Sequence, residues 1–189
     1  MICLNKAAGR MPMRAARAAR VAAFLTGAAL ASTVWAHKAH QHGLARLDIA
    51  VEGRQVLLQL DSPQDNLLGH ERAPRSEAEK REAEAAVATL RAGDKLFAFD
   101  PAAACVQEKV ELDSVPLKLG AGAQSKAAAG HADLGALWSF SCKASPAWVD
   151  VGLLDAFKRM ARVEVQVAAK GQAKTTLRRP ARRVVLGPG

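Results

Sequence analysis

Apolar and polar residues alternate along the chain from position 46 onward. The apolar members are Leu47, Ile49 and Val51 and, after a break at Glu52-Gly53-Arg54, Val56, Leu58 and Leu60. A period of two is typical of a strand with one buried face, and a short break containing glycine is typical of a hairpin turn. The pattern therefore predicts two antiparallel strands over residues 44–62.

A helical pattern follows a polar, turn-prone loop at residues 64–74. Ser76-Glu77-Ala78-Glu79 is a capping box, which marks a helix start, and Gly93 marks its end. The apolar stripe consists of Ala83, Ala86, Val87 and Leu90. The acidic residues of this segment could suggest a metal site, but a solvated helix face explains them better.

The second half of the chain returns to strand patterns. Its apolar positions are Val106, Val110 and Leu112; Ala136, Trp138 and Phe140; Val149 and Val151; Val163, Val165 and Val167; Thr175 and Leu177; and Val184, Val185 and Leu186. Leu153, Leu154, Phe157 and Met160 have helical spacing and predict a short helix. The predicted fold is α+β, with a mainly antiparallel sheet of about six or seven strands, one clear helix and one short helix.

The first 36 residues have the order of a secretory signal. A basic stretch from Arg14 to Arg20 precedes the apolar run Val21–Ala31, and small residues end at Ala36. The run is shorter than the roughly 20 residues that span a bilayer, which disfavours a membrane anchor. We therefore predict a signal peptide at 1–36 and a single periplasmic domain at 37–189, with no membrane span after the signal is removed.

Charge and motifs exclude several functions. Five of the 27 basic residues and none of the 18 acidic residues lie at positions 1–36, so the net charge of the remainder is +4. No basic face with stacking aromatic residues is visible, which argues against nucleic-acid binding. No nucleophile elbow, zinc-protease helix or phosphate-binding loop is present, and the chain has no tyrosine. We expect that the protein is not an enzyme.

Cysteine usage agrees with export. Beyond the leader only Cys105 and Cys142 remain, and an even pair in an oxidising compartment predicts a disulfide. If the strand that starts at Cys105 pairs antiparallel with the strand that ends at Cys142, the two sulfur atoms meet at one edge. The intervening segment, 117–135, is rich in Ala and Gly and is predicted to be a flexible, exposed loop.

Histidines are the candidate metal ligands. Three of them, His37, His40 and His42, lie at the predicted mature terminus, where cleavage would add a free α-amino group. Neutral imidazole binds zinc and copper. His70 and Asp65 could complete the site if the loop after the second strand folds beside the terminus. The alternatives are chance histidines in a disordered end and an ordinary exposed loop histidine at position 70.

The segments that carry these residues resemble a known family. The motifs are His40-Gln41-His42-Gly43, Ser62-Pro63-Gln64-Asp65-Asn66-Leu67-Leu68-Gly69, Ala73-Pro74, the Cys105/Cys142 pair and Val163-Glu164-Val165-Gln166-Val167. Over residues 40–186 the chain is similar to the zinc-regulated ZrgA-type periplasmic proteins. The resemblance implies an exported zinc-binding accessory protein of zinc acquisition, which works beside an uptake transporter.

The chain departs from that family at three places. Members typically carry a long His/Asp-rich loop between the two cysteines, whereas this chain has only His131 there. The family usually has a histidine where Arg72 stands and an aromatic residue where His70 stands. Two other hypotheses therefore remain: a metal-independent exported interaction module that has lost the His-rich loop, and a copper-binding periplasmic protein.

Overall fold

Two β-sheets and four α-helices make up the described part of the protein. The computed structural model describes residues 41–120 and 132–187. The strands are β1 (Leu44–Glu52), β2 (Gln55–Pro63), β3 (Phe97–Phe99), β4 (Val106–Asp113), β5 (Asp133–Ser141), β6 (Trp148–Val151), β7 (Arg162–Ala168), β8 (Gln172–Leu177) and β9 (Arg183–Val185). The helices are α1 (Asp65–Leu68), α2 (Glu77–Arg91), α3 (Gly93–Leu96) and α4 (Leu153–Ala156), and Pro101–Ala103 is a 3₁₀ turn.

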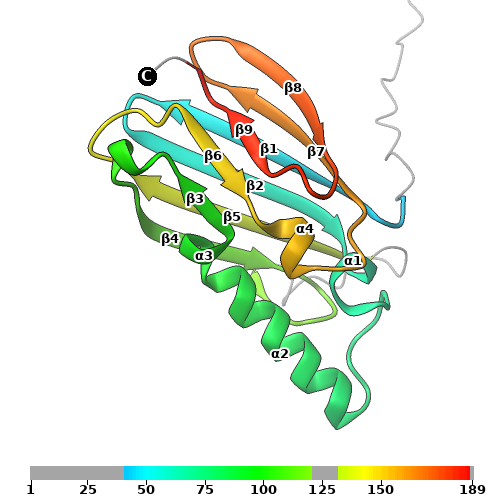
Figure 1. Cartoon of the computed structure of the whole chain (residues 1–189). Coiled ribbons are helices and arrows are strands. Elements are labelled where there is room, and N and C mark those ends of the chain that lie inside the picture. The colour runs from blue at the N-terminus through cyan, green and yellow to red at the C-terminus, as the bar shows by residue number, and fades with distance from the viewer. Residues whose placement is uncertain (1–40, 121–131, 188–189) are drawn as a thin grey trace, which may run out of the picture. The chain divides into compact units, whose positions relative to one another are not determined.

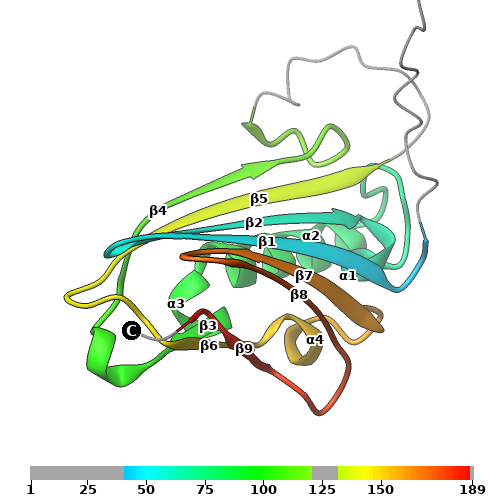
Figure 2. The same cartoon turned by 90° about the horizontal axis from the view of Figure 1, so that it is seen from above.

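The larger sheet has six strands in the order β4-β5-β2-β1-β7-β8, and the smaller has three in the order β3-β6-β9. Neighbouring strands are antiparallel except for β1 and β7, which are parallel. The smaller sheet, α2 and α4 all lie over one face of the larger sheet (Figures 1 and 2). No described helix or strand covers the opposite face, so the larger sheet is buried on one side only.

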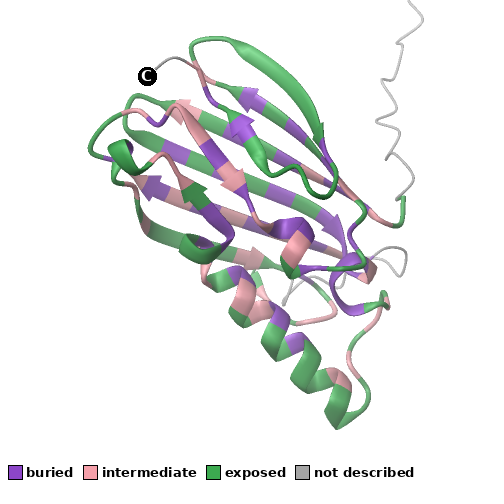
Figure 3. Cartoon of the chain, viewed as in Figure 1, coloured by how far each residue is buried: buried purple, intermediate pink, exposed green. Residues whose placement is uncertain are grey.

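This one-sided burial explains the alternating sequence. Along β1 and β2 the inward residues are almost fully buried, as at Leu47 and Leu58, while their neighbours Asp48 and Gln59 are exposed. Bands of buried and exposed residues therefore alternate along the strands in Figure 3. Burial of apolar side chains between the two sheets is the main source of stability.

Aromatic rings fill the space between the two sheets. Phe97 of β3 lies edge-to-face with Trp138 of β5, with ring centroids 4.9 Å apart. Phe99 packs similarly against Phe140, at 4.8 Å. The Trp138 indole N–H donates to the carbonyl of Leu90, at 2.7 Å, which ties the end of α2 to the core.

Helix α2 begins at the predicted capping box. The amide of Glu79 donates to the Ser76 hydroxyl at 3.1 Å, and the Glu79 carboxylate accepts from the Ser76 amide at 3.3 Å. Its inward face consists of Ala83, Ala86 and Leu90, three of the four residues predicted from the apolar stripe.

The α+β fold is confirmed, but the strand count is higher than expected. Strand β3 has only three residues, which is too short for a period of two to be recognised, whereas β9 overlaps the apolar positions Val184 and Val185 predicted above. The loop predicted at 64–74 contains the short helix α1, and β5 already begins at Asp133, inside the segment predicted as a flexible loop. Residues 121–131 of that segment and the predicted signal peptide lie outside the described residues.

The predicted disulfide between Cys105 and Cys142 is present. Strands β4 and β5 pair antiparallel with Val106 opposite Ser141, so the start of one strand meets the end of the other. A structural disulfide is typical of proteins in an oxidising compartment and fits export. Among the described residues no helix is long and apolar enough to cross a membrane.

Candidate metal-binding site

His42 lies at the beginning of β1, on a backbone that is held from two sides. The carbonyl of the next residue, Gly43, accepts hydrogen bonds from the amides of Ala161 and Arg162, at 2.8 and 2.9 Å. Gly43 has a φ of +79°, and a Cβ added there would lie 3.1 Å from the Cβ of Ala161. Glycine therefore suits this position both because of its left-handed conformation and because of the close approach of residue 161.

The second support is the side chain of Asn66 in α1. Its Oδ1 accepts from the amide of Gly43 at 2.6 Å, and its Nδ2 donates to the carbonyl of Leu44 at 2.8 Å. Nδ2 also donates to the Ser62 hydroxyl at 3.0 Å, and Asn66 is completely buried. One amide side chain thus satisfies the backbone at the start of β1 and fixes it against the end of β2.

Asp65, the neighbour of Asn66, contacts the imidazole of His42. Asp65 Oδ2 lies 2.8 Å from His42 Nδ1, and the side chains are 27% and 70% exposed, respectively. The hydrogen bond leaves Nε2 of His42 without a partner among the described residues. The arrangement is a largely exposed imidazole with one nitrogen bonded to a carboxylate and the other available to a metal ion.

His70 lies in a different environment. Gln64, which is fully buried, donates through Nε2 to the carbonyls of His70 and Arg72, at 3.1 and 2.7 Å, and this nitrogen is 3.4 Å from His70 Nδ1. His70 Nε2 is buried and has no hydrogen-bond partner within the described part of the chain. These contacts place His70 in the connection between α1 and α2, where its imidazole is not open to solvent at Nε2.

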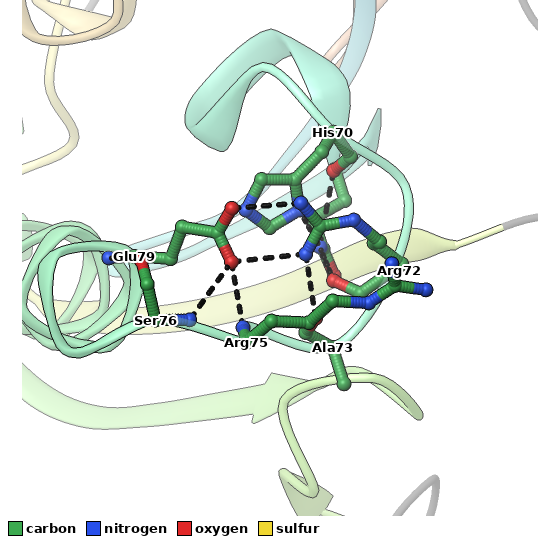
Figure 4. Close-up of polar contacts among 7 residues, drawn as sticks. His70, Arg72, Ala73, Arg75, Ser76 and Glu79 are labelled. Carbon is green, nitrogen blue, oxygen red and sulfur yellow. Dashed lines mark hydrogen bonds and ion pairs between the residues drawn. The ribbon is translucent and has the colours of Figure 1, made fainter.

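The connection between α1 and α2 also contains an ion pair between Arg72 and Glu79 (Figure 4). The Arg72 guanidinium donates to both carboxylate oxygens of Glu79, at 2.9 and 2.7 Å, and the amide of Arg75 donates to Glu79 Oε2 at 2.6 Å. Hydrogen bonds from Arg72 and then from the Arg75 backbone hold the pKa of the Glu79 carboxyl far below its ordinary value. Arg72 is thereby engaged with Glu79, in the first turn of α2.

This ion pair predicts a pH-dependent contribution to stability. A depressed carboxyl pKa stabilises the fold above the unfolded-state pKa, near 4.5, and this contribution is lost as the pH falls below that value. We expect Glu79→Gln to lower the melting temperature at pH 7 and to do so less at pH 3. Thermal unfolding at both pH values measures this, with Glu84→Gln, on an exposed position of the same helix, as the control. Equal deficits at the two pH values would contradict the assignment.

The structure brings some of the predicted ligands together and not others. Asp65 meets His42, while His70 contacts Gln64 instead. No group of three or more His, Cys, Asp or Glu residues within 41–120 and 132–187 could hold a metal ion. His37 and His40 lie outside the described residues. A complete zinc shell of three or four ligands therefore needs groups beyond the His42–Asp65 pair.

The two sequence motifs that form this arrangement, His42-Gly43 and Ser62 to Gly69, both lie in a matched family region. A family model described as ZrgA family zinc uptake protein matches residues 39–186. The chain belongs to this family. No curated protein matches the sequence. Membership in the ZrgA family indicates a role in zinc uptake.

Sequence reasoning missed the residue that organises the site. The composition of residues 64–74 predicts a polar loop, although Asn66 is the buried group that holds the backbone of Gly43 and Leu44 in place. The hairpin carries a signal for the neighbouring residue Asp65, but not for Asn66 itself. The register pairs Arg46 with Asp61, and continuing it for four positions places His42 opposite Asp65.

Proposed function

We propose that this protein is an exported zinc-binding accessory protein of zinc uptake, that it works in the periplasm beside an uptake transporter, and that it is not an enzyme. His42 binds Zn²⁺ through Nε2. His40, two residues earlier, supplies a second imidazole, and His37 supplies a third together with its α-amino group after signal cleavage.

The observation that carries the proposal is the His42–Asp65 pair in a chain of the ZrgA family. The imidazole is 70% exposed, the backbone of the next residue, Gly43, is fixed, and within the described residues the imidazole has one hydrogen-bond partner, Asp65. Imidazole is a preferred zinc ligand. The disulfide supports export, because such bonds persist in oxidising compartments.

A second candidate is the metal-independent interaction module. It is favoured by the absence of a group of three metal-ligating residues within the described residues. Copper is the third candidate, since a terminal α-amino group beside an imidazole also suits Cu²⁺. Metal analysis of the protein recovered from the periplasm of the producing cells separates the three.

Zinc binding by the terminal imidazoles has a direct test. We expect wild-type protein to bind about one Zn²⁺, and His40→Ala/His42→Ala to weaken the affinity by more than about 100-fold. Partners that merely orient a ligand account for about 10–100-fold, and removing two ligands should exceed that range. Calorimetric titration with ZnCl₂ against a weak competing chelator measures the affinities.

The matched control is His131→Ala, which removes the lone histidine of the Ala/Gly segment and should leave the affinity unchanged. Equal zinc binding by wild type and the double variant would remove the terminal site. Absence of zinc binding by the wild type would favour the interaction module, and copper in place of zinc in the recovered protein would favour the third candidate.

A further inference from the structure

We propose that Asp65 is a positioning residue for His42: its carboxylate holds the proton on Nδ1 and turns Nε2 toward the metal, without itself binding the ion. The proposal rests on the proposed zinc function. The proposal assigns a role to the Asp65 carboxylate and states that the metal binds Nε2 of His42 rather than Nδ1.

The hydrogen bond itself selects the tautomer. An ionised carboxylate can only accept hydrogen bonds, and the Oδ2–Nδ1 distance is 2.8 Å, so the proton between them belongs to Nδ1 of His42. In a neutral ring the lone pair is then on Nε2. Histidines that bind metals commonly donate their other ring N–H to a carboxylate, which fixes the ring and makes the ligand more basic.

Both partners stand on rigid backbone. Asp65 begins α1, where its carbonyl accepts from the amide of Gly69 at 2.9 Å, and the next residue is the buried Asn66. The backbone after His42 is fixed by three hydrogen bonds at Gly43. A pair of side chains on two fixed supports holds its geometry with little loss of conformational freedom.

The pair contributes little to folding. His42 is 70% exposed, and an exposed pair of this kind adds little to the stability of a fold because water screens it. A purely structural role would therefore be a weak one. A role in orienting a metal ligand explains why the exposed imidazole of His42 is aligned with the carboxylate of Asp65, the residue directly before the buried Asn66.

The position of Asp65 also argues against direct ligation. Its Oδ2 is used by Nδ1, the nitrogen opposite to the free Nε2 across the ring. A metal on Nε2 therefore lies on the far side of the ring from Asp65. The remaining ligands must therefore come from groups other than Asp65.

The first measurement needs no metal. We expect ¹⁵N NMR of the zinc-free protein at pH 8 to show His42 mainly in the Nδ1–H tautomer, and Asp65→Ala to lose this preference. Asp61→Ala, which removes another carboxylate at an exposed position of the same hairpin, is the matched control and should keep it. An unchanged His42 tautomer in Asp65→Ala would overturn the positioning role, whatever the zinc affinity.

The second measurement uses the metal. Asp65→Ala should weaken Zn²⁺ binding about 10–100-fold and Asp65→Asn less, since an amide oxygen still accepts from Nδ1–H. At saturation with Co²⁺ the visible spectrum of Asp65→Ala should match that of the wild type. A changed spectrum would make Asp65 a ligand and overturn the proposal. Absence of Zn²⁺ binding by the wild type would instead overturn the proposed function, while the tautomer would still report on the hydrogen bond.

Discussion

Cys105→Ser/Cys142→Ser should lower the free energy of unfolding by about 4 kcal/mol. The two cysteines are 37 residues apart, and closing a loop of this length restricts the unfolded chain by about that amount in the chain-entropy model. Since whole domains are stable by only about 5–15 kcal/mol, the variant should be close to the limit of folding at physiological temperature.

The loss should be concentrated in one part of the sheet. Strand β4 is one of the two edge strands of the larger sheet, and its neighbour among the described strands is β5, so the disulfide between Cys105 and Cys142 joins this edge to the sheet. Amide hydrogen exchange should accelerate most in β4 and least in β1 and β2, at the centre of the larger sheet.

Urea unfolding followed by circular dichroism measures the change. Wild-type protein treated with a reductant is the natural control, because it should unfold at nearly the same urea concentration as the double variant. A change below about 1 kcal/mol would show that the loop between β4 and β5 is already restricted in the unfolded chain, which the entropy model does not include.

The sequence predicts the strands correctly where one face of the strand is buried and the other is exposed. Residues such as Leu47 and Val165 face a core while their neighbours face solvent, so the alternation in the sequence reflects the actual environment. The disulfide was predictable for the same reason, since the strand phases place Cys105 and Cys142 at one edge. These features depend on local pattern and on neighbouring strands alone.

Long-range pairing could not be predicted in the same way. The parallel contact of β1 with β7 brings together residues more than 100 positions apart, such as Leu47 and Val165, and no periodicity encodes which strands become neighbours. The division of the strands into two sheets, which contact each other through pairs such as Phe97 and Trp138, likewise depends on tertiary packing.

The candidate site was predictable in its chemistry but not in its construction. His42 and Asp65 could be named as candidate residues from the sequence, and the structure places them in contact. Helix α1 has only four residues, which is too short to show an apolar stripe. Its role depends on Asn66, whose buried contacts are with residues 22 and 23 positions earlier.

Asn66→Ala should therefore strongly destabilise the protein and disturb the His42–Asp65 pair, although Asn66 does not contact the His42 imidazole. The substitution removes the hydrogen bonds of Asn66 to the Gly43 amide, the Leu44 carbonyl and the Ser62 hydroxyl, of which the hydroxyl keeps its bond to the carbonyl of Pro63. Buried polar groups that lose a hydrogen bond cost about 1–3 kcal/mol each, and partial access of water at Gly43 reduces the total. We expect a loss of about 3 kcal/mol in the free energy of unfolding.

Asn66→Asp separates the two halves of the contact. It keeps the acceptor for the Gly43 amide but places a carboxylate oxygen against the Leu44 carbonyl, at a position where the native nitrogen is 2.8 Å away. Two acceptors at that distance repel, so this nearly isosteric variant should also be destabilised. If Asn66→Asp were as stable as the wild type, the donor half of the contact would be unimportant.

The adjacent residue provides the sharpest comparison. Asp65→Ala should change urea unfolding by less than about 1 kcal/mol, because the pair that it breaks is exposed, yet it should weaken zinc binding. Asn66→Ala should reduce both, because zinc binding needs the fixed backbone at Gly43. Unfolding and ZnCl₂ titration of the two variants under the same conditions measure this contrast. If Asp65→Ala and Asn66→Ala lowered the free energy of unfolding equally, the side-chain contact of His42 with Asp65 would matter as much as the backbone contacts of Asn66, and this account of the site would be wrong.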